Sequence, residues 1–163
     1  MKTTEIMAKT ETGCCPRFDP APWDNKIITW KNKPFIKDHI RSFFHVPLNI
    51  GSVMKRACRV VDSAGAADPD FMGLFDENSL WGADVYLSVT KKVPGENNVK
   101  ITGKFMTKVF EGPYYNAGNW AKEMENYVKG MGKTPKKLLF FYTTCPKCAK
   151  HYGKTYTVIF AKI

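Results

Sequence analysis

A short motif occurs twice in the chain, and this repetition limits the folds that the chain can adopt. Residues 44–49 and 110–115 both begin with Phe-x-x-Pro and lie 66 positions apart. A strand-like stretch precedes each copy, over residues 36–46 and 99–110. Self-similarity over this distance indicates a fold built from two similar units.

Apolar residues at helical spacing follow each copy of the motif. They predict helices over residues 52–64 and 116–131, and Gly65 and Gly132 are typical helix stops. Two apolar strands are predicted after each helix, over residues 71–75, 85–89, 138–142 and 156–160. Each half is therefore predicted to run strand-helix-strand-strand.

Neither predicted half has enough strands to bury its helix-facing side alone. We therefore expect the two pseudo-symmetric halves, about 26–92 and about 97–163, to share one sheet or a small barrel with a central cleft. Residues 91–98 are rich in turn formers and join the halves. The predicted fold is one α+β domain over residues 26–163.

An N-terminal extension, residues 1–25, carries Cys14 and Cys15. It lacks the apolar core of a secretory signal, and no run in the chain approaches the length of a membrane span, so we expect a cytoplasmic protein without a membrane partner. The net charge of +10 would suit nucleic acid, but the lysines are scattered and no basic helix with base-reading side chains is present. We therefore expect a solvated basic surface and no nucleic-acid partner.

The duplicated module, with a strand that runs into Phe110-Glu111-Gly112-Pro113-Tyr114, resembles the GyrI-like superfamily of bacterial effector-binding domains. The resemblance covers roughly residues 26–163. It implies two repeats that hold a small, often aromatic or cationic, molecule between them; one branch of the superfamily hydrolyses cyclopropane-bearing genotoxins. No helix-turn-helix precedes the module, so direct control of transcription is not expected.

Two cysteine motifs carry a narrower resemblance. Cys14-Cys15-Pro16 and residues 143–154, which include Cys-Pro-Lys-Cys, resemble a group of small stand-alone prokaryotic proteins, some of which are labelled hydrolase.

A cleft for planar or cationic molecules needs aromatic walls and a buried acceptor. Glu111, at the end of an apolar strand, is the expected acceptor, and His45 is its counterpart in the first repeat. The expected aromatic ligand-binding residues are Tyr114, Tyr142, Trp81 and Trp120. Other interpretations stay open: a surface ion pair or helix cap for Glu111, a core or edge histidine for His45, and core packing for Trp120.

The same residues would serve an enzyme. Glu111 or His45 would activate water, and Tyr114 or Tyr142 would donate a proton to the leaving group or a developing anion. The chain has no Gly-x-Ser-x-Gly elbow, Walker phosphate loop or His-Glu-x-x-His helix, which disfavours the common hydrolase classes.

Four of the five cysteines form two tight groups, and Cys58 is expected to be a buried apolar residue. A Cys-Pro-Lys-Cys turn is typical of a zinc knuckle, and the complete ligand set would be Cys14, Cys15, Cys145 and Cys148. A pair of reactive thiols is the other interpretation. A thioredoxin-type site is disfavoured, because we expect a short loop and not a helix after Cys145.

Three functions follow from these features. The first is a stand-alone cytoplasmic protein that binds a small aromatic or cationic ligand. The second is a small hydrolase that acts on an electrophilic or toxic molecule in the same cleft. The third is a zinc- or thiol-dependent interaction module, and structural zinc is the one cofactor that the sequence suggests.

Overall fold

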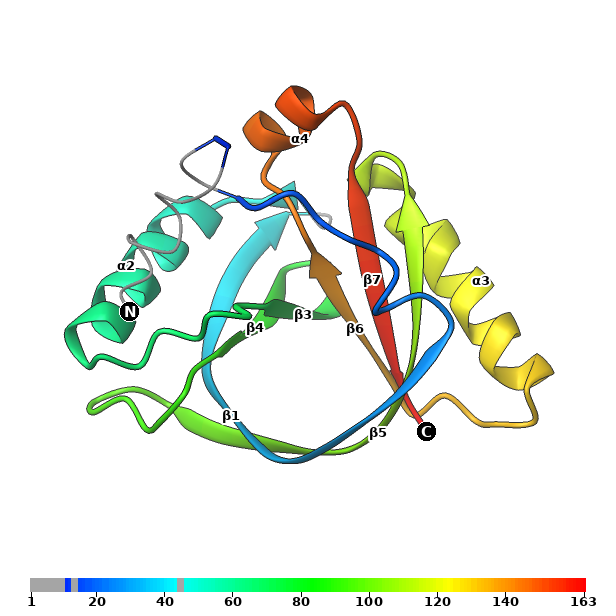
Figure 1. The fold of residues 1–163 in the computed structure, drawn as a ribbon, viewed down its shortest axis with the longest axis horizontal. Coiled ribbons are helices and arrows are strands. Elements are labelled where there is room, and N and C mark those ends of the chain that lie inside the picture. Colours follow the sequence, from blue (N-terminus) through cyan, green and yellow to red (C-terminus); the bar gives the residue numbers. More distant parts are fainter. Residues whose placement is uncertain (1–10, 13–14, 44–45) are drawn as a thin grey trace. The chain divides into compact units, whose positions relative to one another are not determined.

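The computed structural model describes residues 11–12, 15–43 and 46–163 (Figure 1). Two residues of the predicted sites, His45 and Cys14, lie outside this part of the chain. The described residues form a mixed α+β structure, which confirms the predicted class. Its elements are, in chain order, β1 (Lys26–Phe43), β2 (Val46–Pro47), α2 (Ile50–Ser63), β3 (Gly73–Ser79), β4 (Gly82–Ser88), β5 (Asn98–Glu111), η1 (Tyr114–Asn116), α3 (Ala117–Gly130), β6 (Lys137–Tyr142), α4 (Pro146–Tyr152) and β7 (Tyr156–Lys162).

The chain divides into two compact units. Unit 1 is built on Asn32–Ile101, and unit 2 consists of the described residues of Thr10–Lys31 together with Thr102–Ile163. Strands β1 and β5 each contribute residues to both units. None of the helices in the described part of the chain is long and apolar enough to span a membrane.

Unit 1 packs helix α2 against an antiparallel sheet with the order β2-β1-β4-β3. Side chains alternate between the two faces of a strand, so Ile36 and Ile40 of β1 share the face that meets α2. There they form an apolar core with Ala57 and Val61 of the helix. The opposite face of β1 carries Lys37, His39, Arg41 and Phe43.

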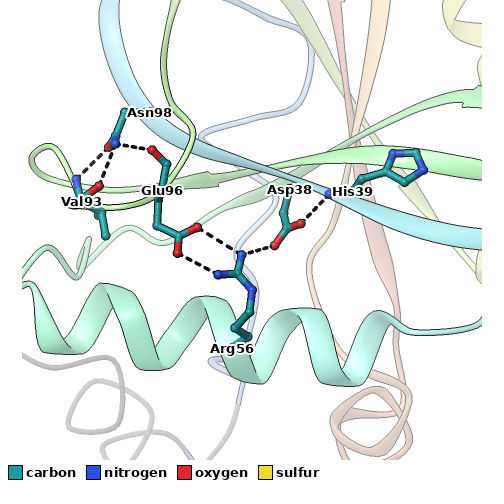
Figure 2. Close-up of polar contacts among 6 residues, drawn as sticks. All are labelled: Asp38, His39, Arg56, Val93, Glu96 and Asn98. Carbon is teal, nitrogen blue, oxygen red and sulfur yellow. Dashed lines mark hydrogen bonds and ion pairs between the residues drawn. The ribbon is translucent and has the colours of Figure 1, made fainter.

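A polar network fastens α2 to its sheet (Figure 2). The Arg56 guanidinium donates to both carboxylate oxygens of Glu96, at 2.8 and 3.1 Å, and also to the Asp38 carboxylate of β1. Asn98 holds the loop that carries Glu96, because its side-chain amide donates to the carbonyls of Val93 and Glu96 at 2.7 and 2.9 Å. The bonds to Glu96, and then those to Asp38, raise the pKa of Arg56.

Unit 2 has the sheet order β6-β7-β5, with packing on both faces. On one face, Trp120 of α3 stacks on Phe110 of β5 with ring centroids 5.7 Å apart. On the other face, Trp30 lies 4.9 Å from Phe105 and 5.3 Å from Phe160. The segment before and at the start of β1 therefore belongs to the core of unit 2.

The structure corrects two local predictions. The segment after Cys145 is the helix α4 and not a loop, with Pro146 at its start and Gly153 in the left-handed conformation at its end (φ 75°). The segment that carries Trp81, between the strands predicted over 71–75 and 85–89, is a short turn and not a long loop, because β3 continues to Ser79 and β4 begins at Gly82.

The network in Figure 2 generates a prediction about stability. Replacing Arg56 with Lys keeps the charge but removes the planar fork that holds Asp38 and Glu96 together. We expect the free energy of unfolding to fall by about 1–2 kcal/mol, since Glu96 is largely buried. The matched control is Arg59→Lys, at an exposed position of the same helix. Equal urea midpoints for the two variants would contradict this role of Arg56.

Candidate functional site

Three cysteine side chains converge in unit 2, and we call them the cysteine cluster: Cys15, Cys145 and Cys148. Their Sγ atoms all lie within 4.8 Å of one another. Cys148 is buried, whereas Cys15 and Cys145 are half-buried. Helix α4, which joins β6 to β7 in Figure 1, carries Cys148 in its first turn, and Cys145 directly precedes it.

Hydrogen bonds hold the sulfur atoms of Cys15 and Cys148. The backbone N–H of Cys145 donates to the Sγ of Cys15 at 3.4 Å. The thiol of Cys148 donates to the hydroxyl of Thr12 at 3.2 Å. The Thr12 hydroxyl accepts this bond and donates its single proton to the Cys15 carbonyl at 3.2 Å, so it links Cys148 to Cys15.

Contacts with α4, β6 and β7 hold the segment around Cys15 in place. The Tyr152 hydroxyl donates to the Cys15 carbonyl at 2.6 Å, and the Arg17 guanidinium lies 4.7 Å from the centre of the Tyr152 ring. Phe18 contacts the rings of Tyr156 and Phe141, with centroids 5.6 and 6.3 Å away. These contacts bring Cys15 to the cluster across a gap of 130 residues in the sequence.

Tyr114 lies next to the cluster and contacts Tyr142, with ring centroids 5.0 Å apart. Its hydroxyl donates to the carbonyl of Thr144 and accepts from the N–H of Thr144 at 3.2 Å. Burial raises the pKa of Tyr114 above its ordinary value of 10.0, and the charges of Cys15 and Cys145 act in the same direction. Tyr114 is therefore neutral at physiological pH, and its single proton is committed to the backbone that precedes Cys145.

The other predicted site residues do not belong to the cysteine cluster. Glu111 is exposed, and its carboxylate lies 4.0 Å from the Lys154 ammonium, as the ion-pair interpretation expects. Trp120 is 7% exposed and packs in the core of unit 2. Trp81 belongs to unit 1, is 58% exposed and contacts Phe43 at 5.7 Å. The ligand cleft between the two halves stays a prediction.

The cluster has the composition of a metal site. Thiolates are preferred ligands of zinc, and tetrahedral Zn–S bonds of about 2.3 Å place the sulfur atoms about 3.8 Å apart. The sulfur atoms of the cluster lie within 4.8 Å of one another, at most about 1 Å beyond that spacing. Three protein ligands leave the fourth position of a tetrahedral zinc ion for Cys14 or for water.

Sequence reasoning missed several residues that the structure brings together. Thr12 and Tyr152 contact the cluster, and only the helical spacing from Cys148 to Tyr152 hints at a shared face. In unit 1, the His39 Nδ1 atom lies 3.0 Å from Asp84. The alternation of β1 places His39 on the face opposite to Ile36, which is the signal that could have found it.

Comparison with curated proteins gives no match to this chain. The model of the family described as "Bacterial hydrolase" matches residues 5–163. This match includes both units and all three residues of the cysteine cluster. Because it covers nearly the whole chain, the chain belongs to the bacterial hydrolase family.

Proposed function

We propose that this protein is a hydrolase whose reaction takes place at a metal ion held by the cysteine cluster. The observation that carries the proposal is the convergence of three sulfur ligands from two distant segments, all within 4.8 Å. Zinc held by three protein ligands supplies an activated water molecule at its fourth position, and three-cysteine zinc sites serve hydrolytic deaminases in this way.

The surroundings of the cluster suit charged thiolates. The Cys145 N–H already donates to the sulfur of Cys15. The Thr12 hydroxyl would donate to a Cys148 thiolate by giving up its bond to the Cys15 carbonyl, which keeps its bond from Tyr152. Second contacts of this kind orient metal ligands and are costly to remove. Tyr114 acts as a positioning residue in this proposal, because its hydroxyl holds the backbone of Thr144 immediately before Cys145.

The proposal extends to superfamily and location. The order β1-α2-β3-β4 in unit 1 and β5-α3-β6-β7 in unit 2, with α4 inserted, supports two repeats of a GyrI-like module. A cytoplasmic location is in keeping with cysteine thiols that lie close to one another without forming a disulfide, since that compartment keeps thiols reduced.

Binding of a small molecule without turnover is the second candidate function. The aromatic pair of Trp81 and Phe43 in unit 1 favours it, because both rings are more than half exposed and offer a planar ligand a surface on which to pack.

Metal content tests the first proposal. We expect the protein purified under reducing conditions to contain about one equivalent of zinc, measured by mass spectrometry of the element. Cys145→Ser and Cys148→Ser should each bind zinc at least about a hundredfold more weakly. The matched control is Cys58→Ser, because Cys58 lies on α2 in unit 1 and belongs to no cluster of metal-ligating side chains in the described chain.

Turnover is measured with the same variants. A panel of esters, amides, phosphoesters and strained electrophiles is incubated with each variant, and products that have gained water are identified by mass spectrometry. Hydrolysis that needs the metal and is lost in Cys145→Ser but kept in Cys58→Ser and Cys14→Ser supports the proposal. If zinc is bound but nothing is hydrolysed, the cluster has a structural role and the proposed reaction site is wrong. A metal-free wild type with full hydrolytic activity also refutes the proposal.

The raised pKa of Tyr114 gives a separate prediction for alkaline pH. Its neutral form is favoured in the folded state, so its stabilising contribution is complete below the unfolded pKa of about 10 and is lost as pH rises through the folded pKa. Wild-type stability should therefore fall above pH ~10 more steeply than that of Tyr114→Phe. Tyr115→Phe, at a position that is 87% exposed, should behave as wild type. Urea unfolding at several pH values measures this, and parallel curves for Tyr114→Phe and wild type would contradict it.

A further inference from the structure

Unit 1 exposes a cluster of large apolar side chains at one end of its sheet. Phe43 and Trp81 are 55% and 58% exposed, and their ring centroids lie 5.7 Å apart. Leu80, the other residue of the turn between β3 and β4, is 43% exposed. Short hairpin turns favour Gly, Asn and Asp, so turn formation does not explain Leu80 and Trp81 at this tip.

A basic side chain lies between this aromatic pair and a histidine. Along β1, His39, Arg41 and Phe43 alternate with core residues and share one face of the strand. Residues two apart on a strand are separated by about 7 Å, so Arg41 is within reach of both its neighbours. In the described part of the chain, the Arg41 guanidinium makes no hydrogen bond or ion pair, whereas Arg17 and Arg56 each do.

The residue across from Arg41 is Gly82, and its lack of a side chain leaves room that the His39 ring occupies. Arg41 pairs with Gly82 in the register of β1 and β4. A Cβ atom at Gly82 would lie only 2.5 Å from His39 Nε2, so the imidazole covers this glycine. Asp84 fixes the ring from the other side through its bond to Nδ1, at 3.0 Å. The Nε2 atom of His39 therefore lies over Gly82, the residue that pairs with Arg41.

We propose that His39, Arg41, Phe43 and Trp81, which we call the aromatic-basic strip, bind a planar aromatic carboxylate. The ring of the ligand packs on Trp81 and Phe43, its carboxylate pairs with Arg41, and His39 Nε2 supplies a neighbouring hydrogen-bonding position. This site lies in unit 1 and shares no residue with the proposed metal site.

The charges of this face favour an anion over a cation. Both carboxylate oxygens of Asp84 are engaged, one by His39 at 3.0 Å and the other by Lys37 at 3.3 Å. Asp76 is the cross-strand neighbour of Asp84 on β3, one strand further from Arg41. Arg41, whose guanidinium has no described partner, is therefore next to Phe43 along this face of β1. Guanidinium groups bind carboxylates through two parallel hydrogen bonds.

The test uses three probes: 2-naphthoate, its neutral isostere 2-naphthamide, and cyclohexanecarboxylate. Binding is followed by chemical-shift changes of the protein and by saturation transfer to the probe. We expect 2-naphthoate to bind about tenfold more tightly than either of the other probes. Arg41→Gln should remove the preference for the anion over the amide. Trp81→Ala should weaken both naphthalene probes by about tenfold.

Matched controls separate this site from general surface binding. Arg59→Gln removes an exposed arginine of the same unit, and Met131→Ala removes an apolar side chain that is 58% exposed in unit 2. Both controls, and Cys145→Ser, should bind 2-naphthoate as wild type does. No binding, or binding that ignores Arg41→Gln and Trp81→Ala, would overturn the proposal. Sedimentation tests a different occupant of this surface. If the wild type is a dimer that Trp81→Ala dissociates and 2-naphthoate has no effect, the proposal is overturned and the surface binds a second copy of the chain.

Discussion

The continuity of β1 is the constraint on which the rest of this structure depends. One strand of eighteen residues supplies Trp30 to the core of unit 2 and Ile36 and Ile40 to the core of unit 1. Because a strand has a period of two, each residue that faces the helix α2 is followed by one that faces away. The apolar requirement of the core therefore also decides where Lys37, His39 and Arg41 are displayed.

The family match and the cysteine cluster are two separate indications of hydrolytic chemistry. Membership of the bacterial hydrolase family covers the whole described chain, and its description leaves the reacting groups unspecified. The cluster supplies candidates for these reacting groups. The predicted cleft residues are weaker candidates, because Glu111 is exposed beside Lys154 and the Tyr114 hydroxyl is hydrogen-bonded to the Thr144 carbonyl. Unit 2 thus holds the groups that we propose as reactive, and unit 1 holds an exposed aromatic and basic surface.

Regular elements with strong periodicity could be predicted from the sequence. The helix predicted over 116–131 is observed at Ala117–Gly130, and that predicted over 52–64 at Ile50–Ser63, because one apolar face in each is complete. The start of β1 was missed by ten residues, since its first residues are held by tertiary contacts of Trp30 and not by alternation. Helix α4 was missed because it has only seven residues. The cysteine motifs predicted that Cys15 and Cys145 could belong to one ligand set. The contacts of Thr12 and Tyr152 with the cluster could not be predicted, because they depend on the tertiary path of the N-terminal segment past α4.

The position of Cys15 in the chain has a consequence for the unfolded state. Cys15 and Cys145 are 130 residues apart, and all of Asn32–Ile101 lies between them. A metal ion that joined them would close one loop around the whole of unit 1, although unit 1 supplies no ligand. By the chain-entropy argument for covalent cross-links, closing a loop of this length removes about 4–5 kcal/mol of conformational freedom from the unfolded chain. Occupancy of a site in unit 2 would in this way restrain the unfolding of unit 1 through the connectivity of the chain alone.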